Sequence, residues 1–407
     1  MCWPIVSPPS TDFNLTFSVS PKIFQTLANM QSTTRPFKFP SIEETTNHPA
    51  YPSAVWNLEP DQRGLFPAAK DRGGPVNIAW EIHGTGPTKL LVRHAPLLFF
   101  STHLTILLTL SFPQLIMGLA GVTASWQRQT RYFGHDRADR FSVLVMDNRG
   151  MGESDKPLGR YSTSAMALDI VEVLDHVGWT GPRQVHAAGI SLGGMIAQEL
   201  ACVIPERLAS LSLLCTSGQV KNTDTVSEWL AQFKGFVVPK SGDEGIVDTA
   251  RKIFVEEWLT APDAEDPPSP ETTPKCGPAL GDGKYRLFDN NFQRFQAQEL
   301  TKRRQPGHFT TQGFLCQLVA AWWHRKTPAQ LAAMADAVGR ERILVLHGAG
   351  DNMIKLSNGQ RLIESIKPGT GMIVEGMGHA PVMERFRWFN ELLEERVLAW
   401  DQIEEES

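Results

Sequence analysis

The sequence predicts an α/β fold: a doubly wound, mostly parallel sheet that carries an inserted helical cap. Two observations lead to this prediction. Short apolar runs alternate with helical patterns along residues 51–218 and 336–407, which is typical of a parallel sheet covered by helices on both faces. Residues 219–335 break that alternation with helical segments and no convincing strand. We therefore expect the α/β core from the first two ranges and a cap from the third.

The individual elements follow from local patterns. Strands are predicted where apolar or alternating runs end at Gly, Asp or Pro, at residues 76–83, 89–92, 141–146, 183–188, 209–215, 343–346 and 372–375. Core helices are predicted from apolar residues at helical spacing, at residues 164–178, 194–204, 355–367 and 383–400. The cap has further helical patterns near residues 224–234, 243–259, 288–303 and 310–325.

The N-terminal residues 1–50 are rich in Pro, Ser and Thr, and we expect them to form a disordered tail. Residues 1–29 carry only two charges, Asp12 and Lys22, so they match neither a secretory signal nor an arginine-rich transit segment. We therefore expect a cytoplasmic protein. A start at Met30 is the alternative to a disordered extension.

Composition excludes several function classes. Of the residues, 42% are hydrophobic and 20% charged, as in soluble globular proteins, and a net charge of −5 argues against a general nucleic-acid partner. The five cysteines are odd in number and widely spaced, which fits neither a disulfide framework nor a C-x-x-C metal site. We expect a reducing compartment and no metal site.

The most informative motif is Gly189-Ile190-Ser191-Leu192-Gly193. It lies between a predicted strand and a predicted helix. A serine on such a sharp turn has strained backbone angles and a hydroxyl that projects into a cleft. Side chains at Gly189 or Gly193 would collide with the adjoining strand and helix. The motif predicts that Ser191 is a nucleophile; the alternative is an ordinary serine in a glycine-rich connection.

Two more polar residues follow predicted strands. Asp351 comes after the strand 343–346, and His379 comes after the strand 372–375. Parallel strands end at one edge of a sheet, so we expect both residues to lie beside Ser191. Either residue alone would be an ordinary turn or structural residue, but the order serine, aspartate, histidine is that of a catalytic triad.

These residue types suit nucleophilic catalysis. A serine hydroxyl is a poor nucleophile until a base accepts its proton, and an imidazole such as that of His379 can accept it and later return it to the leaving group. Asp351 would orient the imidazole. The oxyanion needs two backbone N–H donors, which we expect from Leu192 and from Leu119 in the stretch Gly118–Gly121. This chemistry requires no metal and no organic cofactor.

With Asp147-Asn148-Arg149-Gly150-Met151-Gly152-Glu153-Ser154 and Met117–Gly121, these motifs resemble the α/β-hydrolase fold family, in particular its lipase- and esterase-like branch. The resemblance covers about Gly74 to Trp400. It implies hydrolysis of an ester, thioester, lactone or amide through an acyl-serine intermediate. It also implies that the Asp147–Ser154 loop is a structural turn without chemistry of its own. Epoxide hydrolases and haloalkane dehalogenases of the family have aspartate at the nucleophile position, where this chain has Ser191.

The segment Val92–Gln114 departs from the family pattern, in which the strand before the oxyanion loop runs straight into that loop. Excising it joins Lys89-Leu90-Leu91 to Leu115-Ile116-Met117-Gly118 and restores one strand. We interpret the segment as translated intron sequence. A genuine insertion on the sheet surface is a second interpretation. A membrane span is the third and least favoured: residues 94–127 contain no Asp, Glu, Lys or Arg, but they include prolines and histidines.

The sequence therefore predicts a serine hydrolase of the carboxylesterase or lipase type that acts on a small, partly apolar ester-like substrate. The apolar preference is inferred from aromatic residues of the cap, namely Phe288, Phe292, Phe295, Phe314, Trp322 and Trp323. One alternative is a C–C bond hydrolase or a cofactor-free perhydrolase with the same triad. Another is a non-catalytic ligand-binding or receptor-like protein. The sequence carries no signal for substrate identity, pathway or oligomeric state.

Overall fold

The computed structural model describes residues 37–86, 112–221 and 242–403. The chain divides into two units. The first is Met1–Lys38, of which only residues 37 and 38 are described, and the second is Phe39–Ser407. All the helices and strands below belong to the second unit.

The described part of the chain contains a sheet of eight strands in the order β1-β2-β4-β3-β5-β6-β7-β8. β2 pairs antiparallel with both β1 and β4. The six strands β4, β3, β5, β6, β7 and β8 are parallel to one another. This confirms the predicted α/β class with a mostly parallel sheet. The strand bounds are β1 Gln62–Ala68, β2 Val76–His83, β3 Phe112–Ile116, β4 Val143–Met146, β5 Val185–Ile190, β6 Leu208–Leu214, β7 Ile343–Gly348 and β8 Thr370–Val374.

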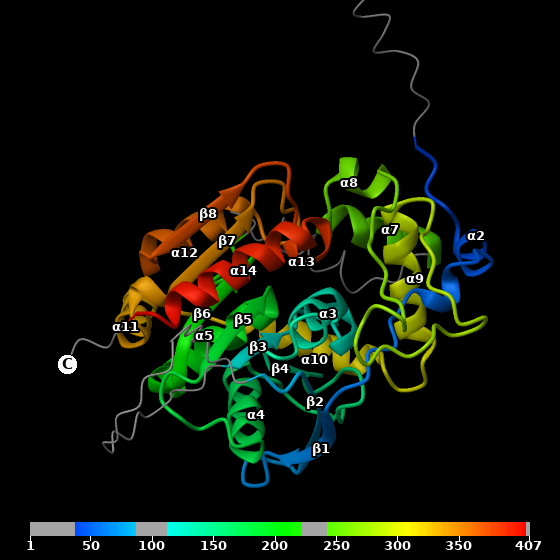
Figure 1. Cartoon of the computed structure of the whole chain (residues 1–407). Coiled ribbons are helices and arrows are strands. Elements are labelled where there is room, and N and C mark those ends of the chain that lie inside the picture. The colour runs from blue at the N-terminus through cyan, green and yellow to red at the C-terminus, as the bar shows by residue number, and fades with distance from the viewer. Residues whose placement is uncertain (1–36, 87–111, 222–241, 404–407) are drawn as a thin grey trace, which may run out of the picture. The chain divides into compact units, whose positions relative to one another are not determined.

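Helices cover both faces of the sheet (Figure 1). One apolar cluster joins the sheet to α4 Thr163–His176, α5 Leu192–Val203, α11 Pro328–Val338 and α12 Leu356–Ile366. A second cluster joins its other face to α3 Gln127–Gly134 and α14 Phe386–Trp400. Each helix turns one apolar stripe to the sheet, so removing a large buried side chain such as Leu200 would cost about 2–5 kcal/mol.

The remaining helices are α2 Ile42–Thr46, α7 Gly242–Ile253, α8 Glu256–Thr260, α9 Asn291–Arg304, α10 Thr311–Trp323 and α13 Pro381–Glu384. Helices α2, α7 and α8 pack against α9, and the group lies to one side of the sheet in Figure 1. The side chains of Asn290 and Thr310 cap α9 and α10 by accepting backbone N–H bonds. The helix predicted near residues 224–234 lies outside the described residues.

Two predicted boundaries differ from the described elements. Residues 37–50, assigned to the disordered tail, include α2, because Ser41 and Glu44 form a reciprocal capping box at its start. Residues 328–335, assigned to the cap, belong to α11, whose Leu331 and Met334 join the core cluster of α5. Strand β1 and helix α3 have no counterpart in the prediction. The tail residues 1–36 lie outside the described part.

Strand β3 uses the end of the anomalous segment 92–114. Phe112, Pro113 and Gln114 pair in parallel with Val185, His186 and Ala187 of β5. A proline has no N–H to donate, which is unusual for an interior strand. The residues predicted to begin this strand, 89–92, lie outside the described part, as do residues 94–111 of the charge-free stretch. Among the helices that are described, none has the length and apolar character to cross a membrane.

We propose that the native strand is Lys89-Leu90-Leu91 joined to Leu115, and we predict that deleting residues 92–114 stabilises the protein. The deletion puts residues with N–H groups where Pro113 now lies. An unmade buried hydrogen bond costs about 1–3 kcal/mol, so the melting temperature should rise by about 2 °C or more. Differential scanning calorimetry of both chains checks this. A deletion chain that melts lower, or a mature transcript that retains these codons, would contradict the proposal.

Candidate active site

Ser191 lies on the turn between β5 and α5, where a nucleophile would be most accessible. Its φ is +57° and its ψ is −121°, a left-handed conformation that side-chain-bearing residues rarely adopt. Such a conformation costs about 1–3 kcal/mol and persists only where the surrounding structure holds it. The side chain is partly exposed, and it lies at the N-terminus of α5, where the helix dipole favours negative charge.

The two glycines of the motif allow this turn to pack. A Cβ atom at Gly193 would lie 2.1 Å from the carbonyl oxygen of Ile116 at the end of β3. A Cβ atom at Gly189 would lie 2.3 Å from the carbonyl oxygen of Gly193. Both distances are too short for any side chain. The helix therefore approaches the strands closely enough to hold Ser191 only because both positions are glycine.

His379 and Asp351 are joined directly. His379 Nδ1 and Asp351 Oδ2 are 2.7 Å apart, and both side chains are buried. The other carboxylate oxygen, Oδ1, accepts the N–H groups of Met353 and Ile354, each at 2.8 Å. An ionised carboxylate only accepts hydrogen bonds, so Nδ1 carries the proton and Nε2 is left to act as a base.

Two residues of the segment 219–335 help to hold the backbone around His379. The His379 N–H donates to the carbonyl oxygen of Ile253 at the end of α7, at 2.6 Å. Glu384 accepts the N–H of Gly378 at 2.6 Å and that of Val255 at 2.9 Å. Burial raises the pKa of Glu384 to about 7, and the two N–H bonds only partly offset that effect.

Ser191 and His379 line one cavity of about 520 Å³. Much of its wall is apolar and comes from α7, α9, α10 and the connections between them, including Ile253, Phe254, Phe295, Phe309, Phe314, Leu318 and Trp322. Among the described residues, no hydrogen bond joins the Ser191 hydroxyl to the imidazole. Such bonds often tighten only when substrate is bound.

Leu119 and Leu192, the predicted oxyanion donors, also line this cavity. Within the described part of the chain, neither backbone N–H donates to a protein group. Leu192 is the first residue of α5, and Leu119 lies in a turn closed by the Gly121 N–H and the Gly118 carbonyl at 3.2 Å. Two N–H groups beside Ser191 are therefore available to a ligand oxygen.

The Asp147–Ser154 loop supports this turn. Asp147 accepts the N–H groups of Thr123 and Glu153, both at 2.8 Å, and burial raises its pKa to about 6. Asn148 Nδ2 donates to the Met117 carbonyl at 3.1 Å. No residue of the Asp147–Ser154 loop lines the cavity of Ser191, so the contacts suit a structural turn.

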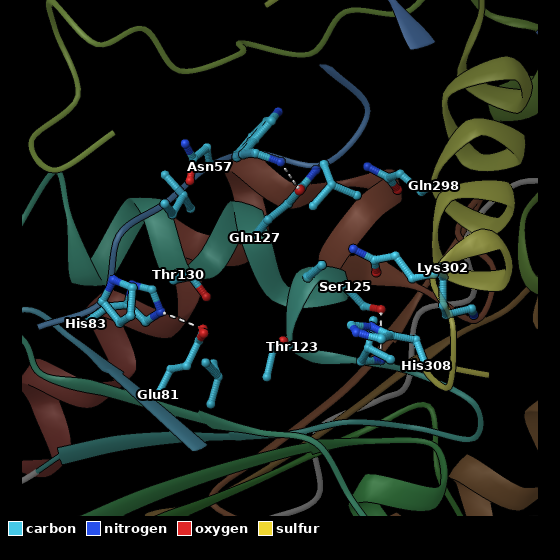
Figure 2. Close-up of a pocket in the computed structure, with 18 of the residues that line it drawn as sticks. Asn57, Glu81, His83, Thr123, Ser125, Gln127, Thr130, Gln298, Lys302 and His308 are labelled. Carbon is cyan, nitrogen blue, oxygen red and sulfur yellow. Dashed lines mark hydrogen bonds and ion pairs between the residues drawn. The ribbon is translucent and has the colours of Figure 1, made fainter. Parts of the chain in front are cut away.

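A second cavity, of about 330 Å³, adjoins the first (Figure 2). It lies between β2, α3 and α9, and its lining includes Glu81, His83, Thr130, Lys302 and His308. Lys302 lines both cavities. The Thr130 hydroxyl is buried without a partner among the described residues.

Sequence analysis missed several residues around Asp351 and His379. Cys215, at the end of β6, has its sulfur within 4.8 Å of the ligand atoms of Asp351 and His379. Burial raises the pKa of this thiol, and the other two groups bond each other, so the cluster suits a metal poorly. His347 Nε2 lies 3.4 Å from Asp351 Oδ2 and donates to the Ile354 carbonyl. Only its position at a strand end could have marked His347.

Comparisons with known proteins identify relatives of this chain. A family model for the alpha/beta hydrolase fold matches residues 115–386, and this match begins directly after the anomalous segment. The 3-oxoadipate enol-lactonase 2 of Acinetobacter baylyi is 27% identical over 269 residues, which are 66% of this chain and 82% of that protein.

Two solved structures have a similar fold. An esterase from Thermogutta terrifontis matches with a TM-score of 0.56 at 19% identity, over 84% of this chain and 100% of that one. The enol-lactonase from Burkholderia xenovorans matches with a TM-score of 0.53 at 17% identity, over 79% of this chain and 96% of that one. At these identities the likeness is one of fold.

The raised pKa of Glu384 predicts a specific pH dependence of stability. Between about pH 4.5 and 7 the folded state binds more protons at Glu384 than the unfolded state does, so this group's contribution to stability falls as the pH rises. The wild-type protein should therefore lose stability relative to Glu384→Gln by about 3 kcal/mol from pH 4.5 to 7.5. Urea unfolding of both proteins across this range measures the difference.

The exposed carboxylate of Glu391, on α14, provides the matched control. A difference for Glu384→Gln that depends on pH no more than the difference for Glu391→Gln would contradict the raised pKa of Glu384.

Proposed function

Because the chain belongs to the α/β-hydrolase fold family, we propose that it is a serine hydrolase that cleaves a carboxylic ester or related acyl bond through an acyl-serine intermediate. One observation carries the proposal. Strained Ser191 and the imidazole of the His379–Asp351 pair line the same cavity. Three distant parts of the sequence thus supply a nucleophile, a base and a carboxylate at one edge of the sheet.

The proposed reaction begins when Ser191 Oγ attacks the substrate carbonyl carbon. His379 Nε2 takes the hydroxyl proton, and Asp351 Oδ2 stabilises the imidazolium through its bond to Nδ1. The tetrahedral intermediate then collapses, and His379 gives the proton to the leaving oxygen. A water molecule repeats the sequence on the acyl-serine and releases the acid.

The negative oxygen of the intermediate is assigned to the N–H groups of Leu119 and Leu192. This assignment is supported by their position in the cavity and by the N-terminus of α5 beside them. Preorganised donors of this kind cost nothing to orient during the reaction, and each contributes about 3–4 kcal/mol to transition-state stabilisation.

The substrate is proposed to be a small ester or lactone with an apolar portion. Residues 219–335 serve as a cap in this proposal, since helices α7, α9 and α10 contribute apolar side chains to the wall, among them Ile253, Phe295, Phe314, Leu318 and Trp322. Burying apolar substrate surface there stabilises the complex by about 25 cal/mol per Å². The names of the enol-lactonase and esterase relatives are consistent with cleavage of an acyl C–O bond.

Loss of the Ser191 hydroxyl should abolish both turnover and covalent labelling. We expect Ser191→Ala to lower kcat for a short-chain nitrophenyl ester by about 10⁴-fold or more and to prevent reaction with a fluorophosphonate probe. Ser164→Ala, which alters an exposed serine of α4, is the matched control and should retain both.

Other outcomes point elsewhere. Labelling of Ser191→Ala at the wild-type rate would exclude Ser191 as the nucleophile. Peracid formation from acetate and peroxide without ester turnover would favour a perhydrolase. A wild-type protein that binds esters but neither turns them over nor reacts with the probe would favour a ligand-binding protein.

A further inference from the structure

We propose that Gln317 and Lys302 are positioning residues for the oxyanion turn Gly118–Gly121. The inference rests on the proposed function, because it concerns how one of the two oxyanion donors is oriented. Both residues belong to the segment assigned to the cap: Lys302 is on α9 and Gln317 is on α10.

The two side chains hydrogen-bond to the backbone N–H and the backbone carbonyl of Ala120. The Ala120 N–H donates to Gln317 Oε1 at 3.0 Å. Lys302 Nζ donates to the Ala120 carbonyl oxygen at 3.0 Å. The peptide groups before and after Ala120 are therefore both held by side chains from distant helices.

The turn needs these two hydrogen bonds because Ala120 has a φ of +59°. An alanine prefers negative φ, since its Cβ atom crowds the following carbonyl in the left-handed region. Relaxation to negative φ would rotate the Leu119–Ala120 peptide and point its N–H away from Gln317. The Leu119 N–H lies one peptide earlier in the same closed turn, so it would move as well.

Gln317 is itself firmly placed. It is fully buried, and its Nε2 donates to the Arg149 carbonyl at 2.9 Å. Asp169 holds the Arg149 side chain through two bonds of 2.5 and 2.6 Å. A Cβ atom on Gly313 of α10 would lie 2.0 Å from the Gly150 carbonyl oxygen, so the helix backbone rests directly on the loop. The Asp147–Ser154 loop thus anchors the amide that holds the turn.

Lys302 is slightly more exposed than Gln317. Its side chain is 9% exposed, and Glu299 Oε1 accepts from Nζ at 2.6 Å. It lines both the cavity of Ser191 and the second cavity, which is shown in Figure 2. The carboxylate of Glu299 therefore compensates the charge of Lys302. The bond from Lys302 Nζ to the Ala120 carbonyl oxygen holds the peptide group that follows Ala120.

The direct test replaces Gln317 and follows the reaction and the backbone separately. We expect Gln317→Leu to lower kcat for a short-chain nitrophenyl ester by about a hundredfold, since a donor displaced by about 1 Å costs that much, while KM changes by less than about threefold. Lys302→Met should lower kcat by about tenfold. Amide hydrogen exchange should become faster at Ala120 in both variants.

Gln312→Leu is the matched control. Gln312 is an exposed residue on the same helix, and it donates to the Lys156 carbonyl without touching the oxyanion turn. It should retain kcat within about twofold and leave exchange at Ala120 unchanged.

A rescue separates positioning from general destabilisation. Glycine adopts positive φ without penalty, so adding Ala120→Gly to Gln317→Leu should recover about fivefold of the lost kcat. A merely misfolded Gln317→Leu protein would gain nothing from that change.

The proposal is overturned if Gln317→Leu keeps kcat within about threefold or leaves exchange at Ala120 unchanged. Failure of the proposed function gives a different pattern. A wild-type protein without turnover or probe labelling would refute the proposed hydrolase function. Hydrogen exchange at Ala120 would still test the positioning role, because an unchanged exchange rate in Gln317→Leu would refute that role on its own.

Discussion

The left-handed turn at Ser191 is the constraint on which the rest of the site depends. It exists because α5 packs against the end of β3 with only the backbone of Gly193 between them, a Cβ atom there being 2.1 Å from the Ile116 carbonyl. The N-terminus of α5 and the turn Gly118–Gly121 line the same cavity as Ser191. The strained backbone of Ser191 is thus maintained by the close packing of α5 against β3.

The segment proposed as a cap contributes fixed hydrogen bonds as well as an apolar wall. Ile253 accepts the N–H of His379, and Lys302 and Gln317 hold Ala120. The proposed base, His379, and one proposed oxyanion donor, Leu119, therefore depend on residues that are far from both in the sequence. A change in how α7, α9 or α10 is seated would alter catalytic geometry together with the shape of the substrate cavity.

The fold and the placement of Ser191, Asp351 and His379 at one edge of the sheet were predictable because their signals are local. Ser191, Asp351 and His379 each follow a short apolar strand, and parallel strands end at one edge of a sheet. Gln317, Lys302 and Glu384 were not predictable. Their roles arise from tertiary contacts between the inserted helices and core loops, for which the sequence has no periodic signal. Helix α11 was misassigned for the same reason, since packing against α5 decides where the core resumes.

The most direct test is a crystal structure of the protein after reaction with a phosphonate ester, which mimics the tetrahedral intermediate. The account predicts a bond from phosphorus to Ser191 Oγ, with one phosphonyl oxygen within about 3 Å of the backbone nitrogens of Leu119 and Leu192. It also predicts that His379 Nε2 lies within about 3.2 Å of Ser191 Oγ. An adduct on another residue, or an oxygen that faces away from both N–H groups, would contradict it.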